Sequence, residues 1–284
     1  MSEAPSLLQI LYDDVVRRAL AEDLGRAGDV TTDAIVPPDL PGRAVVVARR
    51  AGRVAGLEPA LHSFRLLDSA CVAEVRLPDG GDAAAGQVIA RVSARARALL
   101  TGERTALNLL GRLSGIATAT RDVVARLQGL STRVADTRKT TPGLRALEKY
   151  AVRVGGGSNH RYGLDDAVLV KDNHVSLAGG ITEAVRRVRA SSGHLVKVEV
   201  EVDTLAQLDE ALALGVDGVL LDNMDLETLR EAVQRARGRA LTEASGGVRP
   251  ENVRAIAETG VDLVSIGWLT HSAPALDVAL DVEA

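Results

Sequence analysis

The sequence predicts an α/β protein whose C-terminal half is a parallel α/β barrel of six or seven strands. From Val134 onward, short apolar runs alternate with helical stretches. Reference residues in five successive runs are separated by 30, 21, 23 and 22 residues. Such spacing fits parallel strands joined by crossover helices. It leaves two arrangements open, an open doubly wound sheet and a barrel.

Two further observations favour the barrel. No G-x-G-x-x-G turn opens this region, so a dinucleotide-binding doubly wound sheet has no support. In the segment 196–202, Lys197, Glu199 and Glu201 alternate with valines, so one face of the strand is charged and the other is apolar. A sheet covered by helices on both faces would bury these charges unpaired, at a large cost in free energy. In a barrel the charged face points inward and the valines pack against the helices.

The other elements follow from the spacing of apolar residues. Residues 7–20 and 99–127 have apolar side chains at helical spacing and predict helices. The stretch 42–92 contains short apolar runs separated by Gly, Pro and Asp, which indicates strands joined by tight turns. Barrel strands are predicted within 134–140, 167–174, 196–202, 218–223, 240–247 and 263–267.

Composition excludes several classes of protein. The chain has 284 residues, a net charge of −4 and only five aromatic residues, which disfavours nucleic acid as a partner. It contains no run of 18 apolar residues and no basic-then-apolar N-terminal segment, so neither a membrane span nor a signal peptide is expected. Cys71 is the only cysteine, which excludes an intrachain disulfide. We therefore expect a cytoplasmic protein with no nucleic-acid or membrane partner.

Charge is distributed unevenly along the barrel region. Residues 133–171 contain eight Lys or Arg and four Asp or Glu, whereas residues 197–227 contain one Lys and nine acidic residues. All four lysines of the chain, among 34 basic residues, fall between 139 and 197. A basic block followed by an acidic block suggests an anionic ligand beside a metal ion, and two solvated faces are the alternative.

Barrel enzymes place their sites at the C-terminal ends of the strands. Arg138, Lys139, Arg161 and Lys171 would converge there, and four cations at one place imply a multiply charged anionic ligand. Any single arginine among them is better explained by an outward salt bridge, whereas the four together favour the ligand. Arg138 and Lys139 are adjacent, so both can face the site only if their strand has already ended.

Acidic and glycine-rich strand ends suggest further ligands. Glu201 and Asp222 on neighbouring strands have the oxygen chemistry that Mg²⁺ prefers, and pairing with Lys171 or Lys139 is the structural alternative. The last two predicted strands end in Ser245-Gly246-Gly247 and in Ile266-Gly267, before helices. Free backbone N–H groups in such turns, with His271 close by, suit a phosphate group.

Several segments together resemble the sequence motifs of one protein family. The blocks that carry the resemblance are 103–118, 136–164, 171–174, 199–202, 220–223, 243–247 and 266–272, with EDLGRAGDVTT at 22–32. They strongly resemble the quinolinate phosphoribosyltransferase family, the decarboxylating enzymes of NAD biosynthesis. The long block DTRKTTPGLRALEKYAVRVGGGSNHRYGL at 136–164 is the most specific of them.

The resemblance implies conversion of quinolinate and phosphoribosyl pyrophosphate to nicotinate mononucleotide, pyrophosphate and CO₂, with Mg²⁺ as cofactor. It implies an N-terminal α/β sandwich-like domain (1–112), an incomplete α/β barrel (113–271) and a C-terminal segment (272–284) that returns to the first domain. It also implies a homodimer in which Arg104 acts in trans. On sequence alone, the stripe formed by Arg104, Asn108 and Arg112 indicates only a solvated helix face.

The family pattern assigns a role to particular residues of this chain. Trp268 departs from it, since a small residue is expected there. Lys139, Lys171, Glu201 and Asp222 are implied as catalytic, with Glu201 and Asp222 binding the metal. The implied substrate-binding set is Arg104, Thr137, Arg138, Lys139, His160, Arg161, Lys171, Glu201, Asp222, Ser245, Gly246, Gly247, Ile266, Gly267, Trp268 and His271.

Three other functions are considered. A paralogous phosphoribosyltransferase would act on another aromatic acid, but the full cationic set favours a dicarboxylate. A Schiff-base aldolase would use Lys171 or Lys139, yet such a lysine needs an apolar pocket rather than neighbouring charges. A sensor of phosphoribosyl pyrophosphate or a pyridine carboxylate without turnover is not supported by any DNA-binding helix pair.

Overall fold

The structure, a computed structural model, describes residues 7–283. Its contacts divide these residues into two compact units. The first comprises the described parts of Met1–Arg121, Thr140–Gly156 and Trp268–Ala284, and the second comprises Asp122–Lys139 and Gly157–Gly267. Each unit is described separately below.

The first unit is built on an antiparallel sheet with strand order β12-β1-β5-β3, from β1 (Pro41–Ala48), β3 (Val72–Val75), β5 (Val88–Arg95) and β12 (Val278–Glu283). The C-terminal strand β12 pairs with β1 from Arg43↔Glu283 to Ala48↔Val278. A small second sheet joins β2 (Gly52–Arg53) to β4 (Asp82–Ala83). The helices of this unit are η1 (Gln9–Leu11), α1 (Asp13–Leu24), α2 (Val30–Ile35), α3 (Leu57–Leu67), α4 (Ala96–Arg126, whose last turn belongs to the second unit), α5 (Arg145–Val154) and α11 (Trp268–His271).

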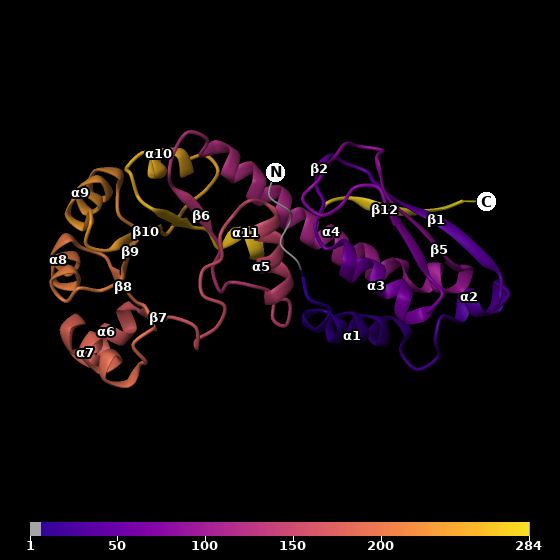
Figure 1. The fold of residues 1–284 in the computed structure, drawn as a ribbon, viewed down its shortest axis with the longest axis horizontal. Coiled ribbons are helices and arrows are strands. Elements are labelled where there is room, and N and C mark those ends of the chain that lie inside the picture. The colour runs from indigo at the N-terminus through magenta and orange to yellow at the C-terminus, as the bar shows by residue number, and fades with distance from the viewer. Residues whose placement is uncertain (1–6, 284) are drawn as a thin grey trace. The chain divides into compact units, whose positions relative to one another are not determined.

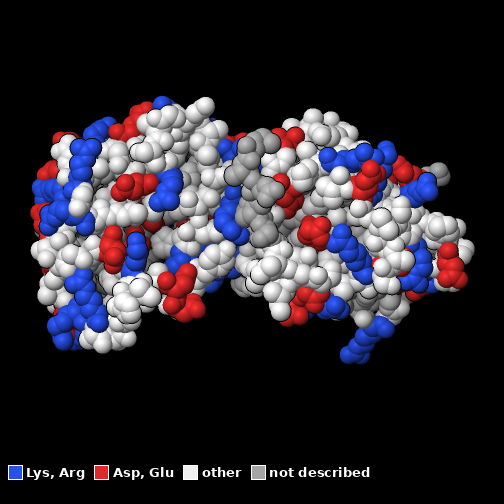
Figure 2. Space-filling view, in the orientation of Figure 1, with Lys and Arg blue, Asp and Glu red and all other residues white. Residues whose placement is uncertain are grey.

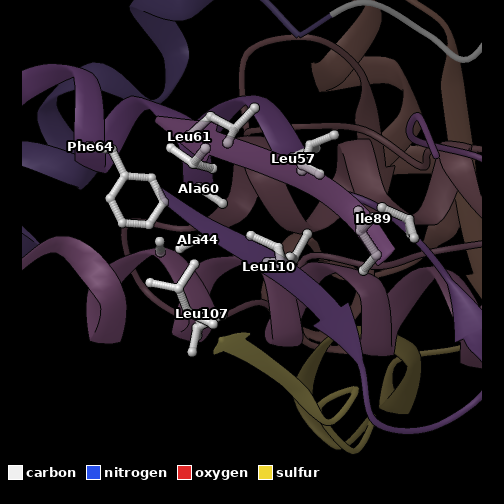
Figure 3. Packing of buried hydrophobic residues seen from close by; sticks show 14 of the residues in the cluster. Ala44, Leu57, Ala60, Leu61, Phe64, Ile89, Leu107 and Leu110 are labelled. Carbon is white, nitrogen blue, oxygen red and sulfur yellow. The ribbon is translucent and has the colours of Figure 1, made fainter. Parts of the chain in front are cut away.

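The core of this unit lies between the sheet and the helices α3 and α4. Figure 3 shows Phe64 and Leu61 of α3, Leu107 of α4 and Ala44 of β1 together in this layer. Phe64 is completely buried, and burying one such side chain stabilises the fold by roughly 1.5–3 kcal/mol. Helix α3 was not among the predicted elements, because it lies between two strand-rich segments in the sequence. The expected helix at 99–127 is a single helix that begins three residues earlier.

Helix α4 contributes to a second apolar core, shared with α1 and α5. Val16 of α1, Leu113 and Ile116 of α4, and Leu147 of α5 are all buried in it. Because α5 packs here, the segment 140–156 belongs to the first unit, although barrel segments flank it in the sequence. A single cut along the chain does not reproduce this grouping, and the boundary between residues 112 and 113 stays a prediction.

A salt bridge between Arg112 of α4 and the buried Glu148 of α5 links these two helices. Glu148 is fully buried, and its carboxylate accepts hydrogen bonds from Arg112 Nη2 at 2.9 Å, from Thr141 Oγ1 at 2.8 Å and from the Thr141 backbone N–H at 3.0 Å. Arg112 also donates to the carbonyl of Ala273 at 3.2 Å. Arg112 therefore has a structural role, whereas Arg104 and Asn108 of the predicted stripe are exposed.

The second unit contains a six-stranded parallel sheet within the described residues, with strand order β6-β11-β10-β9-β8-β7. Its strands are β6 (Arg133–Ala135), β7 (Val168–Val170), β8 (Val198–Val202), β9 (Gly218–Asp222), β10 (Leu241–Ser245) and β11 (Leu263–Ser265). Its helices are α6 (Asp172–Ala178), α7 (Ile181–Ser191), α8 (Leu205–Ala213), α9 (Leu226–Ala236) and α10 (Val253–Ala257). Figure 1 shows α8 and α9 on the outside of the strands. Strands β6 and β7 are at the two ends of this order and do not pair with each other, so the barrel is incomplete, as predicted.

The alternation predicted for 196–202 is confirmed from residue 198 onward. Val198, Val200 and Val202 are buried, whereas Glu199 and Glu201 are half-buried on the other face of β8. Charges of both signs are intermixed on the face of the molecule seen in Figure 2. No helix within residues 7–283 is long and apolar enough to cross a membrane.

Candidate active site

A cavity of about 430 Å³ lies in the barrel unit, at the C-terminal ends of the strands. Nine residues of the predicted site line it, and they come from five strands or the segments that follow them. The lining consists of Thr137, Arg138, Lys139, His160, Arg161, Leu169, Lys171, Glu201, Leu220, Asp222, Glu243, Ser245 and Ser265. This is where a β/α barrel carries its chemistry.

The basic part of the cavity begins just after β6. This strand ends at Ala135, so the chain is no longer extended where Arg138 and Lys139 occur, and both of them line the cavity. Lys171 follows the end of β7 and is the N-cap residue of α6. The three cations therefore reach the cavity from the ends of β6 and β7, the two outermost strands of the sheet.

A buried aspartate brings the segment 157–161 alongside β6. Asp136 is fully buried and accepts hydrogen bonds from the His160 backbone N–H at 2.9 Å and from Asn159 Nδ2 at 2.6 Å. Ser158 bridges to Ala135 in a parallel direction. These contacts hold the backbone of His160 at the cavity wall.

Arg161 stands beside other positive charge. Its Nη1 donates to the carbonyl of Ala167 at 3.0 Å. Burial lowers the pKa of Arg161, and the positive charge of Arg138 lowers it further. Such a pair of guanidinium groups favours binding of an anion between them.

The acidic part of the cavity comes from β8 and β9. Glu201 Oε2 lies 3.6 Å from Lys171 Nζ. Burial raises the pKa of Glu201, Lys171 lowers it, and the negative charge of Asp222 raises it. Glu201 therefore lies close to Lys171, its partner if the carboxylate is structural. It also interacts with Asp222, the second carboxylate that a metal site would use.

The glycine turn after β10 has a conformation that requires glycine. Ser245 is the last residue of β10, and Gly246 and Gly247 have φ values of +89° and +59°. Helix α10 begins only at Val253, so this turn is not itself the N-terminus of a helix, in contrast to the expectation from sequence. Gly267, by comparison, directly precedes α11.

The remaining predicted residues do not line this cavity within the part of the chain that the structure describes. Arg104 lies exposed on α4, and His271 lies exposed on α11, where its Nδ1 is 2.6 Å from Ser272 Oγ. Ile266 is buried after β11, and Trp268 is half-buried at the start of α11. Gly246 and Gly247 form the turn described above.

Sequence reasoning missed four lining residues, Leu169, Leu220, Glu243 and Ser265. Glu243 had a detectable signal. It precedes Ser245 by two residues on one strand, and side chains two residues apart lie on the same face. The same rule that pointed Glu199 inward therefore applies to Glu243.

Comparison with known proteins agrees with this architecture. Residues 29–114 match the family described as "Quinolinate phosphoribosyl transferase, N-terminal domain", and residues 116–281 match the one described as "Quinolinate phosphoribosyl transferase, C-terminal domain". The chain belongs to the quinolinate phosphoribosyltransferase family. The family resemblance predicted from sequence is therefore confirmed.

Individual members of the family are similar along almost the whole chain. A nicotinate-nucleotide pyrophosphorylase (carboxylating) of Mycobacterium leprae is 47% identical over 281 residues, covering 95% of this chain and 96% of the relative. A probable nicotinate-nucleotide pyrophosphorylase (carboxylating) of Bacillus subtilis is 45% identical and covers 92% and 90%. The crystal structure of NadC from Streptococcus pyogenes is 39% identical, with a TM-score of 0.94 and coverage of 99% and 100%.

Substitution of Gly246 tests whether the turn after β10 requires glycine at this position. A Cβ there would overlap the carboxamide of Asn223, and the positive φ adds strain of about 1–2 kcal/mol. Gly238, at φ +73° with open space around it, isolates the strain alone. We expect Gly246→Ala to lower the free energy of unfolding by about 1–3 kcal/mol more than Gly238→Ala does, measured by urea titration. Equal losses in the two variants would contradict the overlap.

The buried carboxyl group of Glu243 predicts an unusual pH dependence of stability. Burial raises its pKa to about 7, and the negative charge of Glu199 contributes in the same direction. Between the unfolded value, about 4.3, and 7 the folded protein binds more protons, so this group makes stability fall as pH rises. Glu243→Gln removes that fall. We expect the variant to gain on the order of 1–3 kcal/mol over wild type between pH 5 and pH 8.

Urea unfolding of both proteins at the two pH values measures this difference. All other carboxyl groups are common to both, so their contributions cancel. A stability difference between the variant and wild type that is the same at pH 5 and pH 8 would show that Glu243 ionises with an ordinary pKa.

Proposed function

We propose that this protein transfers the phosphoribosyl group of phosphoribosyl pyrophosphate to quinolinate, giving nicotinate mononucleotide, pyrophosphate and CO₂ in de novo NAD biosynthesis. The observation that supports it most directly is that one cavity is lined by four basic and three acidic side chains at the C-terminal ends of the strands. Membership of the family supports it independently. The single cysteine, which excludes an intrachain disulfide, supports a cytoplasmic location.

The cationic groups suit the two carboxylates of quinolinate. Arg138, Arg161 and Lys171 line one cavity, and the pKa of Arg161 is already lowered by its neighbour Arg138. An anion with two negative groups relieves this repulsion, and planar guanidinium groups bind carboxylates through paired hydrogen bonds. A monocarboxylate such as nicotinate would leave part of the positive charge unmatched.

The carboxylates suit a magnesium ion bound with phosphoribosyl pyrophosphate. Glu201 and Asp222 offer hard oxygen ligands on neighbouring strands, and the effect of Asp222 on the pKa of Glu201 indicates an accumulation of negative charge that a divalent cation neutralises. We infer that these two residues hold Mg²⁺, which when bound supplies positive charge to the pyrophosphate leaving group. Lys139 and the backbone of the Ser245–Gly247 turn would bind phosphate oxygens, together with the backbone at Ile266 and Gly267.

The chain's own residues then act mainly by orientation and charge. Arg138, Arg161 and Lys171 hold quinolinate with its ring nitrogen directed at the ribose carbon that carries pyrophosphate. A nitrogen–carbon bond forms as the bond to pyrophosphate breaks, and Lys139 offsets the negative charge that leaves. The carboxylate beside the now cationic nitrogen departs as CO₂, its bonding electrons enter the ring, and a solvent proton replaces it. No covalent intermediate with the enzyme is required.

We further propose a homodimer in which Arg104 completes the quinolinate site of the partner subunit. Arg104 is exposed on α4, and Asn108, one turn later on the same helix, is exposed as well. An exposed arginine on a long helix is suited to contribute to a site in a symmetric partner.

A product assay by mass spectrometry tests the proposed reaction. The purified protein is incubated with phosphoribosyl pyrophosphate, Mg²⁺ and either quinolinate or nicotinate. We expect nicotinate mononucleotide from quinolinate, with one CO₂ per turnover, and no product from nicotinate. Product from nicotinate alone would favour the paralogue acting on another aromatic acid, and no product from a folded protein with either acid would overturn the proposal.

A further inference from the structure

Three titratable side chains meet in the barrel interior. His160 and Glu243 line the candidate active-site cavity, and Glu199 lines a second cavity to which both of them also contribute. His160 Nε2 lies 3.4 Å from Glu199 Oε2 and 3.6 Å from Glu243 Oε1. The side chains of His160 and Glu199 are 13% and 17% exposed, and that of Glu243 is 2% exposed. Glu243 Oε1 is buried and makes no hydrogen bond in the structure. The imidazole thus faces two carboxylates, one of which has a free acceptor atom.

The other ring nitrogen of His160 determines which tautomer is present. The backbone N–H of Arg161 donates to His160 Nδ1 at 2.7 Å. A nitrogen that accepts a hydrogen bond carries no proton, so the proton of the neutral ring must be on Nε2. The nearest acceptor atoms to that N–H group are the carboxyl oxygens of Glu199 and Glu243. The hydrogen bond at Nδ1 and the acceptor atoms near Nε2 therefore both indicate the Nε2–H tautomer.

A metal ion is the alternative occupant of this cluster. The three potential ligand atoms lie within 4.8 Å of one another, which is compatible with a shared ion. A metal on Nε2, however, needs that nitrogen without its proton, and the proton would then move to Nδ1. Nδ1 already accepts from Arg161, so the local hydrogen bonding opposes a metal and favours the hydrogen-bonded arrangement.

Two of the three residues in this cluster lie on strands, on either side of β9. Glu199 on β8 is in register with Gly218 on β9, where an added Cβ would lie only 3.4 Å from the Glu199 carboxylate. Glu243 lies on β10, the next strand. Asp136 fixes the backbone of His160 from the other side.

We propose that Glu199 and Glu243 are positioning residues that hold His160 as the neutral Nε2–H tautomer and thereby shape the quinolinate site. The role toward quinolinate rests on the proposed function, whereas the tautomer of His160 does not depend on it. His160 then adds no positive charge to the cavity and transfers no proton to substrate. Its ring and the hydrogen-bonded backbone of Arg161 form one rigid wall, so the Arg161 guanidinium is held ready for a carboxylate.

Nitrogen NMR of protein labelled with ¹⁵N in histidine tests the tautomer directly. The chain has five histidines, and a His160→Asn variant identifies the signal of His160 by its loss. We expect a protonated Nε2 and an unprotonated Nδ1 in the folded protein, unchanged by Zn²⁺. A proton on Nδ1, or a shift of the Nε2 signal on adding Zn²⁺, would overturn the proposal.

Matched substitutions test the role of the two glutamates. Glu199→Met with Glu243→Met removes both acceptors, whereas Glu199→Gln with Glu243→Gln retains an amide oxygen at each position. We expect the Met pair to lose the single tautomer and to raise the KM for quinolinate about 10-fold, with kcat and the KM for phosphoribosyl pyrophosphate nearly unchanged. The Gln pair should retain the tautomer and most of the affinity for quinolinate.

Controls separate failure of this inference from failure of the proposed function. Glu199 is partly exposed, so Glu199→Met alone serves if the double variant does not fold, and it should weaken the same tautomer signal. An unchanged tautomer together with an unchanged quinolinate KM in a folded Met variant would overturn the inference. A wild-type protein without any turnover of quinolinate would overturn the proposed function, while the NMR result would still decide the tautomer.

Discussion

Replacing Asp222 with Asn, or Glu201 with Gln, should lower kcat/KM for quinolinate phosphoribosylation by about 1000-fold. Both changes are nearly isosteric and remove one negative charge from neighbouring strands at the cavity. The loss should appear as a higher Mg²⁺ requirement and a lower kcat, because charge on the leaving pyrophosphate is then poorly neutralised. Steady-state rates at several Mg²⁺ concentrations measure both effects.

A surface carboxylate supplies the control for this experiment. Glu183 on α7 forms ion pairs with Arg186 and Arg187, and these arginines lower the pKa of its carboxyl group. Glu183→Gln removes the same charge and should leave turnover unchanged. If both cavity variants stayed within tenfold of wild type at saturating Mg²⁺, neither carboxylate would hold the metal. Binding of quinolinate alone, followed by calorimetry, should be little affected by Asp222→Asn.

The barrel was predictable because its signal is local. Alternation of charge and valine in β8 follows from the two-residue repeat of a strand, and the structure confirms it. The same repeat made an earlier strand end the condition for both Arg138 and Lys139 to face the cavity, and the structure meets this condition because β6 ends at Ala135. Residues at strand ends in a barrel are therefore assigned to a site by position, before any distance is known.

Other features depend on partners that are distant in the sequence. Arg112 was interpreted as part of a solvated face, yet its guanidinium is bound to the buried Glu148, 36 residues away. Helix spacing shows which residues share a face but not what covers that face. The cluster of His160, Glu199 and Glu243 is likewise assembled from a loop and two strands. The contribution of Glu243 becomes visible only once β10 is known to lie beyond Gly218.

The assignment of Arg104 to a partner's site predicts complementation between two inactive variants. Arg104→Ala and Lys171→Ala should each be nearly inactive as homodimers. In a mixed dimer, the barrel of the Arg104→Ala subunit keeps its own Lys171 and receives a normal Arg104 from its partner. With random exchange, half of the dimers are mixed and each has one intact site, so activity should return to roughly a quarter of wild type.

A second mixture makes this result specific. Lys171 and Asp222 line the same cavity of one barrel, so a dimer of Lys171→Ala with Asp222→Asn has a damaged site in each subunit. That mixture should stay inactive, while native mass spectrometry of differently tagged subunits shows equal exchange in both mixtures. Recovery in the first mixture alone requires that Arg104 and Lys171 of one site come from different chains. Inactivity of the first mixture despite exchange would place both residues in the same subunit's site, and the exposed stripe on α4 would then be a solvated face after all.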